Sequence, residues 1–172
     1  MGGELKDLVE SADGALVVVT TVAEGETSGC VVGFHSQSGL TPARYALWIS
    51  KANHTYRVMI RADHFAVHFL TEDDVDVARH FGTQTEDEVD KFADLGWTPG
   101  PGGVPLVDAL PHRIVVRKDT MLDPTGDHVG VFGEIVEVHG EGGFTPFRLS
   151  AANHWQPGHD AEDRAIDPEG DG

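Results

Sequence analysis

The chain has 172 residues, 40% of them apolar, and its 29 acidic residues against 12 Lys and Arg give a net charge of −17. This length suits one domain with a sizeable core, and the negative charge repels polyphosphate backbones, which argues against nucleic-acid partners. Cys30 is the single cysteine, which excludes an internal disulfide, and the lack of both a signal-peptide pattern and an apolar run of about 20 residues predicts a cytoplasmic protein without membrane partners.

The first part of the chain contains one predicted helix and three predicted strands. Apolar residues at helical spacing predict a helix over 4–12. The β-branched run at 15–22 predicts a buried strand, and further strands are expected at 28–35 and 45–50. The polar turn expected between the last two strands consists of Ser36, Gln37 and Ser38.

The middle of the chain is predicted to contain two helices separated by a strand. Asn53 or Thr55 can cap a helix that runs to about residue 62. A strand follows at 65–70, and Thr71 can cap the next helix. Because strands do not alternate with long helices, a doubly wound sheet is disfavoured.

The last part of the chain is predicted to hold most of the remaining strands. Gly and Pro predict a loop at 96–103, and strands are expected at 114–117, 129–138 and 144–150. About seven strands with short helices indicate an α+β fold that is mainly β, with an antiparallel, partly closed barrel. We expect residues 1–155 to form this single domain. The acidic segment 156–172 has few apolar residues and is predicted to be a disordered tail.

Several classes of site are disfavoured by residue spacing. Ten histidines invite a metal-site interpretation, but no pair has the spacing of a recognised site, so scattered histidines are favoured and no metal is predicted. Cys30 lies in the middle of a predicted strand, which favours a small buried side chain over a nucleophile. No GxGxxG motif follows a strand, which excludes a Rossmann nucleotide site.

The clearest candidate site is the start of the second predicted helix, where polar residues gather. Ser50, Lys51, Asn53 and Thr55 gather where the second helix is expected to begin, and such a helix start is suited to a phosphate. Cys30, Val31, Val32 and Gly33 of the predicted strand at 28–35 could supply backbone groups and an apolar wall for a flat ring, with Gly33 allowing close approach.

The order of motifs over residues 12–150 resembles the flavin reductase-like family. That family carries a G-x-T-x-x-S-F-x-S strand, an F-x-V-N-x-L strand, an A-x-x-F helix, a D-K-F segment and a G-D-H strand start. The matching stretches here are Gly29-Cys30-Val31-Val32-Gly33-Phe34-His35-Ser36, Phe65-Ala66-Val67-His68-Phe69-Leu70, Ala78-Arg79-His80-Phe81, Asp90-Lys91-Phe92 and Gly126-Asp127-His128.

The resemblance implies a split β-barrel, Greek-key-like, that binds FMN or FAD. It implies NADH or NADPH as co-substrate, reduction of the flavin as the activity, a homodimer, and a flavin-dependent monooxygenase as partner. It places His128 near the ring face where a nicotinamide stacks, as the catalytic residue. The residues that it assigns to the cofactor are Cys30, Val31, Val32, Gly33, Ser36, Gln37, Ser38, Ser50, Lys51, Asn53, Thr55, Lys91 and Phe92.

Some residues depart from the family pattern and leave alternatives open. The usual Thr is Cys30, and a usually polar position is Val32, so the ring environment is more apolar. His128 could equally be a strand-start histidine that bonds Asp127. The alternative functions are a flavin-binding electron-transfer or sensor protein without reductase activity, and a barrel that binds haem or another cofactor.

Overall fold

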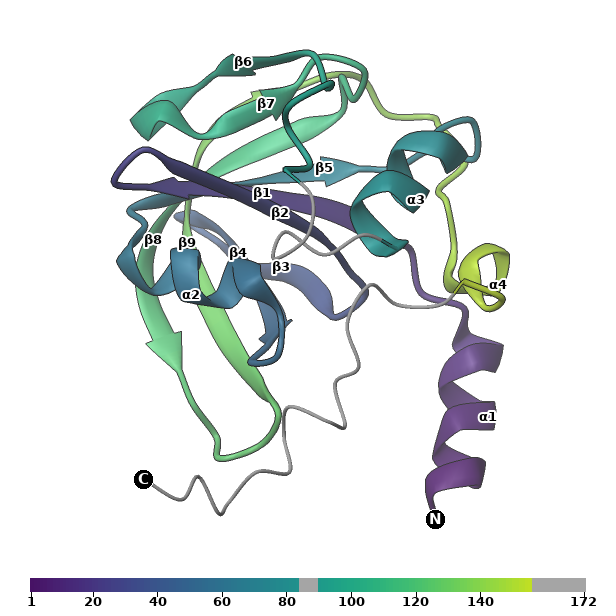
Figure 1. Cartoon of the computed structure of the whole chain (residues 1–172). Helices are drawn as coiled ribbons and strands as arrows, with labels where there is room; N and C mark the ends of the chain where they lie inside the picture. The colour runs from purple at the N-terminus through teal and green to yellow at the C-terminus, as the bar shows by residue number, and fades with distance from the viewer. Residues whose placement is uncertain (84–89, 156–172) are drawn as a thin grey trace, which may run out of the picture.

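The computed structural model describes residues 1–83 and 90–155, so the predicted tail at 156–172 lies outside the described residues. Within these ranges the chain forms a curved antiparallel sheet with short helices around it (Figure 1). The elements are, in chain order, α1 Gly2–Ala12, β1 Val17–Ala23, β2 Glu26–Val32, β3 His35–Leu40, β4 Ala43–Ser50, α2 His54–Arg61, β5 His64–Phe69, α3 Val75–Thr83, β6 Trp97–Pro99, a 3₁₀ turn Pro101–Gly103, β7 Pro105–Val107, β8 Arg113–Leu122, β9 His128–His139 and α4 Leu149–Ala152.

The main sheet of the described residues has seven strands in the order β2-β1-β5-β8-β9-β4-β3. All its pairings are antiparallel, and β2 and β3 form the two edges. The sheet curls until the ends of β2 and β4 border the same cavity, which is described below. The sheet is therefore a barrel that stays open along one line between β2 and β4, and the predicted mainly-β, partly closed barrel is confirmed.

The buried strand β1 separates two hydrophobic cores. Val17 and Val19 point into the barrel, where they pack with residues such as Leu47 and Phe65. Val18 lies on the opposite face and packs in a second core that includes Phe81 of α3. Burial of both faces explains the continuous β-branched sequence of this strand.

Two of the helices cover the barrel as the sequence predicts. Asn53 caps α2, with its side-chain oxygen accepting a hydrogen bond from the Thr55 amide at 3.0 Å. Val58 and Met59 of α2 are fully buried. The α3 helix begins at Val75, four residues after the predicted Thr71, because a turn intervenes. None of the helices that the described residues form is long and apolar enough to span a bilayer.

Three sequence-based assignments of local structure are wrong. Ser36, Gln37 and Ser38 form part of β3 and not a turn, because an edge strand paired with β4 needs no apolar face. The predicted loop at 96–103 contains β6 and a 3₁₀ turn. The predicted strand at 144–150 makes only isolated bridges at Pro146 and Arg148, and the chain then enters α4; proline lacks the N–H that a ladder needs.

A glycine sets the close contact between the two longest strands. A Cβ at Gly133 of β9 would overlap the carbonyl oxygen of Arg117 on β8. The register between these strands shifts nearby, between Lys118 and Thr120. Only glycine tolerates this approach, which lets β8 and β9 bend around the barrel.

His68 on β5 is a fully buried histidine with both ring nitrogens bonded. Its Nδ1 lies 3.1 Å from the Val18 carbonyl oxygen, so this nitrogen carries the proton. Its Nε2 accepts a hydrogen bond from the Val107 amide at 3.1 Å. Burial lowers the pKa of His68 from 6.5 to about 4, with a smaller opposing effect from the Val18 bond and some repulsion from Arg113.

We expect His68 to make the fold sensitive to acid. The unfolded chain takes up a proton near pH 6.5 that the folded chain resists until about pH 4, so stability falls as the pH drops through this interval. Between pH 7 and pH 5 the loss should be about 2 kcal/mol. Urea unfolding of the wild type and of His68→Gln at both values measures it. A variant whose stability falls as steeply as that of the wild type would contradict this account.

Candidate functional site

A cavity of about 430 Å³ lies where β2 and β4 approach without pairing, and we call it the seam cavity. It is bordered by β2, β4, the end of α1 and the start of β9. Its lining residues are Lys6, Val9, Glu10, Gly14, Leu16, Cys30, Val31, Val32, Gly33, Phe34, Trp48, Ile49, Ser50, Asn53, His128 and Leu149.

The walls of the seam cavity are mainly apolar. Leu16, Val31 and Ile49 supply aliphatic surface, and the Trp48 ring adds an aromatic one. Small-molecule sites have volumes of about 300–1,000 Å³ and combine apolar walls with a few polar groups. The size and lining therefore fit a flat aromatic ring system.

The polar groups of the seam cavity cluster around the start of α2. The Ser50 hydroxyl oxygen accepts a hydrogen bond from the Ala52 amide at 3.2 Å. Asn53 uses its side-chain oxygen to cap α2, which leaves its NH₂ group available to a ligand. This side of the cavity therefore suits the polar portion of a ligand whose ring lies against the apolar walls.

His128 borders the same cavity and is held by its neighbour. Its Nδ1 lies 2.8 Å from the Asp127 carboxylate, and this hydrogen bond lowers the pKa of Asp127. The Phe34 ring packs against the imidazole, with 5.3 Å between ring centroids. Because Nδ1 donates to Asp127, the neutral ring has its lone pair on Nε2. The predicted contact of His128 with Asp127 is confirmed, and its role as a site residue stays a prediction.

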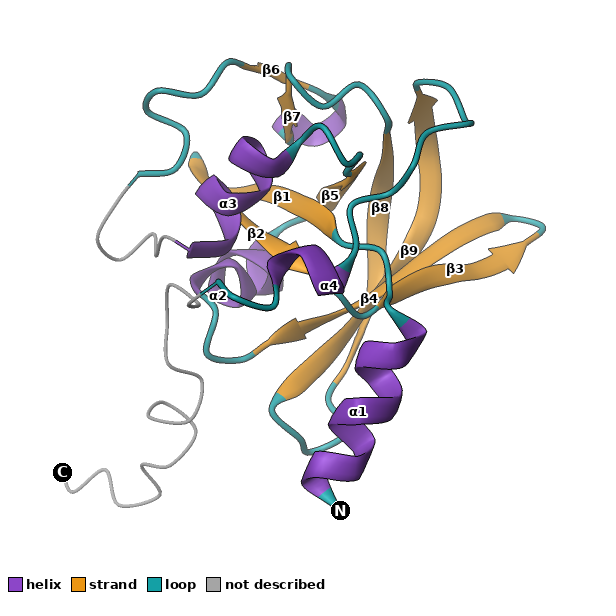
Figure 2. Cartoon of the chain, turned by 90° about the vertical axis from the view of Figure 1, so that its right-hand side faces the viewer, coloured by secondary structure: helices purple, strands orange, loops and turns teal. Residues whose placement is uncertain are grey.

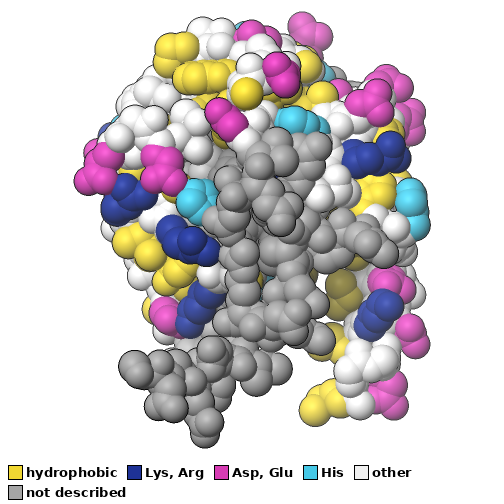
Figure 3. Space-filling model, viewed as in Figure 1, with side chains coloured by type: hydrophobic (Ala, Val, Ile, Leu, Met, Phe, Trp, Pro, Cys, Tyr) yellow, Lys and Arg dark blue, Asp and Glu magenta, His cyan; other side chains and the backbone are white. Residues whose placement is uncertain are grey.

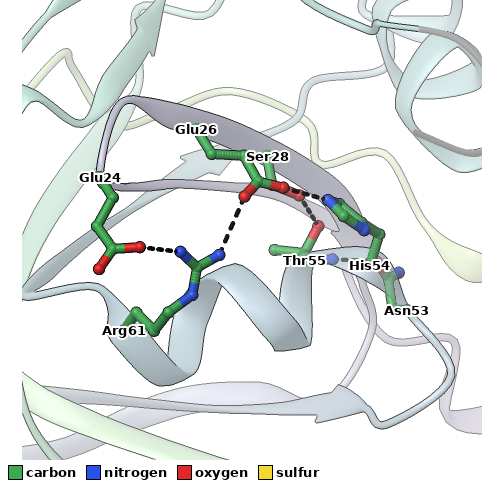
Figure 4. Close-up of polar contacts among 7 residues, drawn as sticks. All are labelled: Glu24, Glu26, Ser28, Asn53, His54, Thr55 and Arg61. Atoms are coloured by element: carbon green, nitrogen blue, oxygen red, sulfur yellow. Dashed lines mark hydrogen bonds and ion pairs between the residues drawn. The ribbon is translucent and has the colours of Figure 1, made fainter. Parts of the chain in front are cut away.

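Two residues predicted to bind phosphate are already engaged. Thr55 is fully buried, and its hydroxyl lies 2.8 Å from the Ser28 hydroxyl (Figure 4). Lys51 donates to the Asp123 carboxylate at 3.0 Å. Neither side chain lines the seam cavity, so any phosphate contact by them remains a prediction that requires these bonds to rearrange.

The remaining predicted residues lie away from the seam cavity. Lys91 is buried, and its Nζ donates to the carbonyl oxygens of Gly29 and Phe81, both at 3.0 Å. Phe92 packs in the second core beneath α3. Lys91 thus braces β2 next to Cys30, and a direct contact of Lys91 or Phe92 with a ligand stays a prediction. The exposed strand β3 carries the other three, Ser36, Gln37 and Ser38.

Sequence reasoning missed the contribution of segments distant in the chain. Val9 and Glu10 of α1 line the seam cavity, as does Leu149. The amide of Leu149 donates to the Gly14 carbonyl at 3.0 Å, which brings these segments together. No local signal in the sequence marks this contact. Trp48 is the one missed lining residue with such a signal, because an aromatic side chain in a predicted strand is a candidate for a cavity wall.

A second cavity of about 310 Å³ lies on the other side of the α2 start, and we call it the Glu26 cavity. It is lined by Gly25, Glu26, Thr27, His54 and Asp90. Asn53 lines the seam cavity and the adjacent His54 lines this one, so the two cavities flank the start of α2.

Glu26, in the lining of this cavity, makes ion pairs with His54 in the same lining and with Arg61 outside it. Figure 4 shows the Glu26 carboxylate between His54, at 2.7 Å, and Arg61, at 3.0 Å. Arg61 also donates to Glu24 at 2.5 Å. The hydrogen bond from Arg61, and then that from His54, lower the pKa of Glu26. In the described ranges, no group of three or more His, Cys, Asp or Glu side chains is placed to hold a metal ion.

Comparison with known proteins identifies related sequences and structures. The family model "Flavin reductase like domain" matches residues 11–153. The reductase subunit Stc3 of a stachydrine N-demethylase from Rhizobium meliloti is 27% identical over 128 residues, 72% of this chain and 54% of that protein. The reductase subunit HsaB of a flavin-dependent monooxygenase from Mycobacterium tuberculosis is 28% identical over 120 residues, 70% of this chain and 62% of that protein.

A solved structure shares the fold. The flavin reductase domain protein from Arthrobacter sp. FB24 superposes with a TM-score of 0.73 and 19% identity, covering 83% of this chain and 87% of that one. The likeness supports the split-barrel architecture. The chain spans about half the length of several curated relatives that it matches.

We expect substitutions of Asn53 to show how much its cap of α2 contributes to folding stability. Asn53→Ala removes the cap of α2 and should cost about 1 kcal/mol of folding stability. Asn53→Asp keeps a capping oxygen and should leave stability within about 0.5 kcal/mol of the wild type. Urea unfolding of both variants tests this, and equal losses in the two variants would contradict the capping role.

Proposed function

Because the chain belongs to the flavin reductase-like domain family, we propose that it is an NAD(P)H-dependent flavin reductase. It binds FMN or FAD in the seam cavity and catalyses hydride transfer to the flavin from NADH or NADPH. The observation that carries the proposal is the apolar, 430 Å³ seam cavity with polar groups confined to one side. The proposed unit is residues 1–155.

The residues of the seam cavity fit the parts of a flavin. Val31, Ile49 and Trp48 would hold the faces of the ring, and the backbone between Cys30 and Gly33 would meet its polar edge. Ser50 and Asn53 would lie toward the chain that carries the phosphate. When bound, the flavin supplies the two-electron chemistry, and the protein orients it and excludes water.

His128 is proposed to position the second ring of the reaction. Asp127 fixes its orientation through Nδ1, and the Phe34 ring packs against it at an interplanar angle of 55°. Together these contacts hold the imidazole at the border of the seam cavity, where a nicotinamide can approach the flavin. Hydride transfer between two rings needs no acid–base triad.

A homodimer is part of the proposal, and the support for it is α1. All eleven residues of α1 are described, and none is buried. Leu8 is 71% exposed and Leu5 is 60% exposed. Figures 1 and 2 show α1 extending from the barrel with little of the chain against it. A second copy that covers this apolar face would also enclose the seam cavity, because Val9 lines it.

The partner and the location follow from the proposed chemistry. The matched relatives include a reductase subunit of a flavin-dependent monooxygenase, and we propose that this chain also supplies reduced flavin to such an enzyme. A cytoplasmic location is proposed because the reaction consumes NADH or NADPH.

The function predicts a flavin spectrum and its reduction. Protein mixed with FMN and desalted should retain visible flavin absorbance, which NADH or NADPH should bleach without oxygen. Val31→Trp fills the seam cavity and should weaken flavin binding at least about tenfold. Leu40→Trp, at an 81% exposed position, is the control and should bind as the wild type does.

Two outcomes would contradict the function. A retained flavin that neither nucleotide bleaches would indicate a carrier or sensor. Equal flavin affinity in Val31→Trp and Leu40→Trp would exclude the seam cavity as the flavin site.

If α1 forms the proposed dimer interface, a charged residue on its apolar face should make the protein monomeric. Leu8→Glu should convert a dimer to a monomer in sedimentation experiments, because the charge would be buried at the interface. Ile60→Glu alters an exposed apolar residue of α2 and should leave the dimer intact. A monomeric wild type, or a dimeric Leu8→Glu variant, would refute this interface.

A further inference from the structure

His35, at the start of β3, uses both nitrogens of its ring. Its Nε2 lies 2.8 Å from the Ala15 carbonyl oxygen, and its Nδ1 lies 2.8 Å from the Tyr45 hydroxyl. A carbonyl oxygen can only accept a hydrogen bond, so Nε2 carries the proton. In the neutral ring Nδ1 then accepts from the Tyr45 hydroxyl, which stays protonated because burial raises the pKa of Tyr45 to about 12. The imidazole therefore has one tautomer and one orientation.

These two hydrogen bonds connect opposite ends of the main sheet. Tyr45 belongs to β4 and packs in the barrel core, whereas Ala15 leads directly into β1, the neighbour of the edge strand β2. Among the described residues, β2 and β4 share no ladder. His35 therefore supplies a side-chain connection at the line along which the barrel stays open.

Both of the segments that His35 connects border the seam cavity. Phe34 precedes His35 in the chain and Leu16 follows Ala15, and both Phe34 and Leu16 line the cavity. A Cβ at Gly33 would lie 3.3 Å from the Leu16 side chain, so the two segments are in close contact. A change in the distance between His35 and Ala15 would therefore move the wall of the cavity.

Backbone hydrogen bonds hold each of these segments on its own side. The Phe34 carbonyl accepts from the Trp48 amide of β4 at 2.8 Å. The Leu16 amide donates to the Phe147 carbonyl, also at 2.8 Å. Since these bonds lead to different parts of the fold, they do not by themselves fix the two segments relative to each other. The bond from His35 to Ala15 does so directly.

We propose that His35 is a positioning residue of the flavin site and acts through its Nε2 bond to Ala15. This bond holds the segments of Phe34 and Leu16 together where they border the seam cavity, so that the wall is preorganised for the ring of the flavin. Phe34 in turn packs against His128. The inference rests on the proposed function, because the ligand is the flavin of the same cavity.

Two substitutions separate the two hydrogen bonds of His35. The amide of Gln reaches the position of Nε2 and keeps a donor for Ala15, whereas the shorter amide of Asn reaches only the position of Nδ1 and keeps an acceptor for Tyr45. His35→Asn should therefore loosen the cavity wall. His35→Gln should not loosen it, although it leaves the Tyr45 hydroxyl without its partner and lowers folding stability. A purely structural role would make the less stable variant the looser one.

The thiol of Cys30 reports the opening of the wall without any ligand. Cys30 is the only cysteine in the sequence, lines the seam cavity and is 2% exposed. N-ethylmaleimide should alkylate it at least about fivefold faster in His35→Asn than in the wild type, and within about twofold of the wild-type rate in His35→Gln. Urea unfolding of each variant gives its unfolded fraction, which corrects the rates for labelling through global unfolding.

The affinity for FMN is the second readout. In a titration followed by flavin fluorescence, FMN should bind His35→Asn at least about fivefold more weakly than it binds the wild type. The affinity of His35→Gln should stay within about twofold of the wild-type value, because its bond to Ala15 is kept.

A matched control shows whether the loss of any histidine has the same effect. Histidine side chains lie at more than one place on the surface of the molecule (Figure 3). His139 is exposed and its Nδ1 lies 2.9 Å from the Pro111 carbonyl oxygen, but neither residue lines the seam cavity. His139→Ala removes a hydrogen bond of the same kind and should change neither the alkylation rate of Cys30 nor the affinity for FMN.

The outcomes that overturn the proposal are specific to the Nε2 bond. Equal alkylation rates in the wild type and His35→Asn would overturn it, as would a His35→Gln or His139→Ala variant that is alkylated as fast as His35→Asn. If His35→Asn does not fold, a long-range ¹H–¹⁵N spectrum of the wild type decides. A slowly exchanging proton on Nε2 of His35 would support the bond to Ala15, and a proton on Nδ1 alone would exclude it.

The two readouts also separate this proposal from the proposed function. If the wild type binds no flavin, the proposed reductase function fails. Alkylation of Cys30 that is fast in His35→Asn and slow in His35→Gln would then still support the role of His35 in holding the cavity wall. Flavin binding that is equal in the wild type and His35→Asn would leave the proposed function intact and overturn the positioning role.

Discussion

The open line between β2 and β4 is the constraint on which the site depends. In a small closed barrel, side chains can fill the interior completely. Here β2 and β3 are the edges of the sheet, and the ends of β2 and β4 approach without forming a ladder. The backbone from Cys30 to Gly33 therefore remains accessible to a ligand, while the core behind it stays packed. The cavity is a consequence of the topology and not of a single residue.

The acidity of the chain shapes this site through local pairing. A net charge of −17 could repel any anionic ligand, yet the carboxylates near the cavities are matched by Lys6, Lys51, His54 and Arg61. Exposed ion pairs contribute little to stability. Their consequence is that the positive charges are not freely available to phosphate groups.

The cavity residues that the sequence predicts were found from patterns within short stretches of the chain. Cys30 to Gly33, Ser50 and Asn53 lie at the ends of strands or the start of a helix, so local pattern and motif order were enough to find them. The polar helix start assigns Thr55 and Lys51 to a phosphate, but the sequence does not reveal which side chains they contact in the fold. Ser28 and Asp123 lie 27 and 72 residues away in the chain, and only the folded barrel brings them into contact. The contribution of α1 depends on a similar long-range contact with Leu149.

The attachment of α1 connects the site to the surface of the molecule. The segment after this helix is fixed by Asp13, whose carboxylate accepts hydrogen bonds from both the amide and the hydroxyl of Ser150 at 2.8 Å. Within residues 1–83 and 90–155, these hydrogen bonds anchor the helix at its end, while Leu5 and Leu8 stay exposed. Because Val9 lines the seam cavity, whatever covers the apolar face of α1 also determines how open the cavity is to water. In the proposed dimer, assembly and ligand access are therefore set by the same helix.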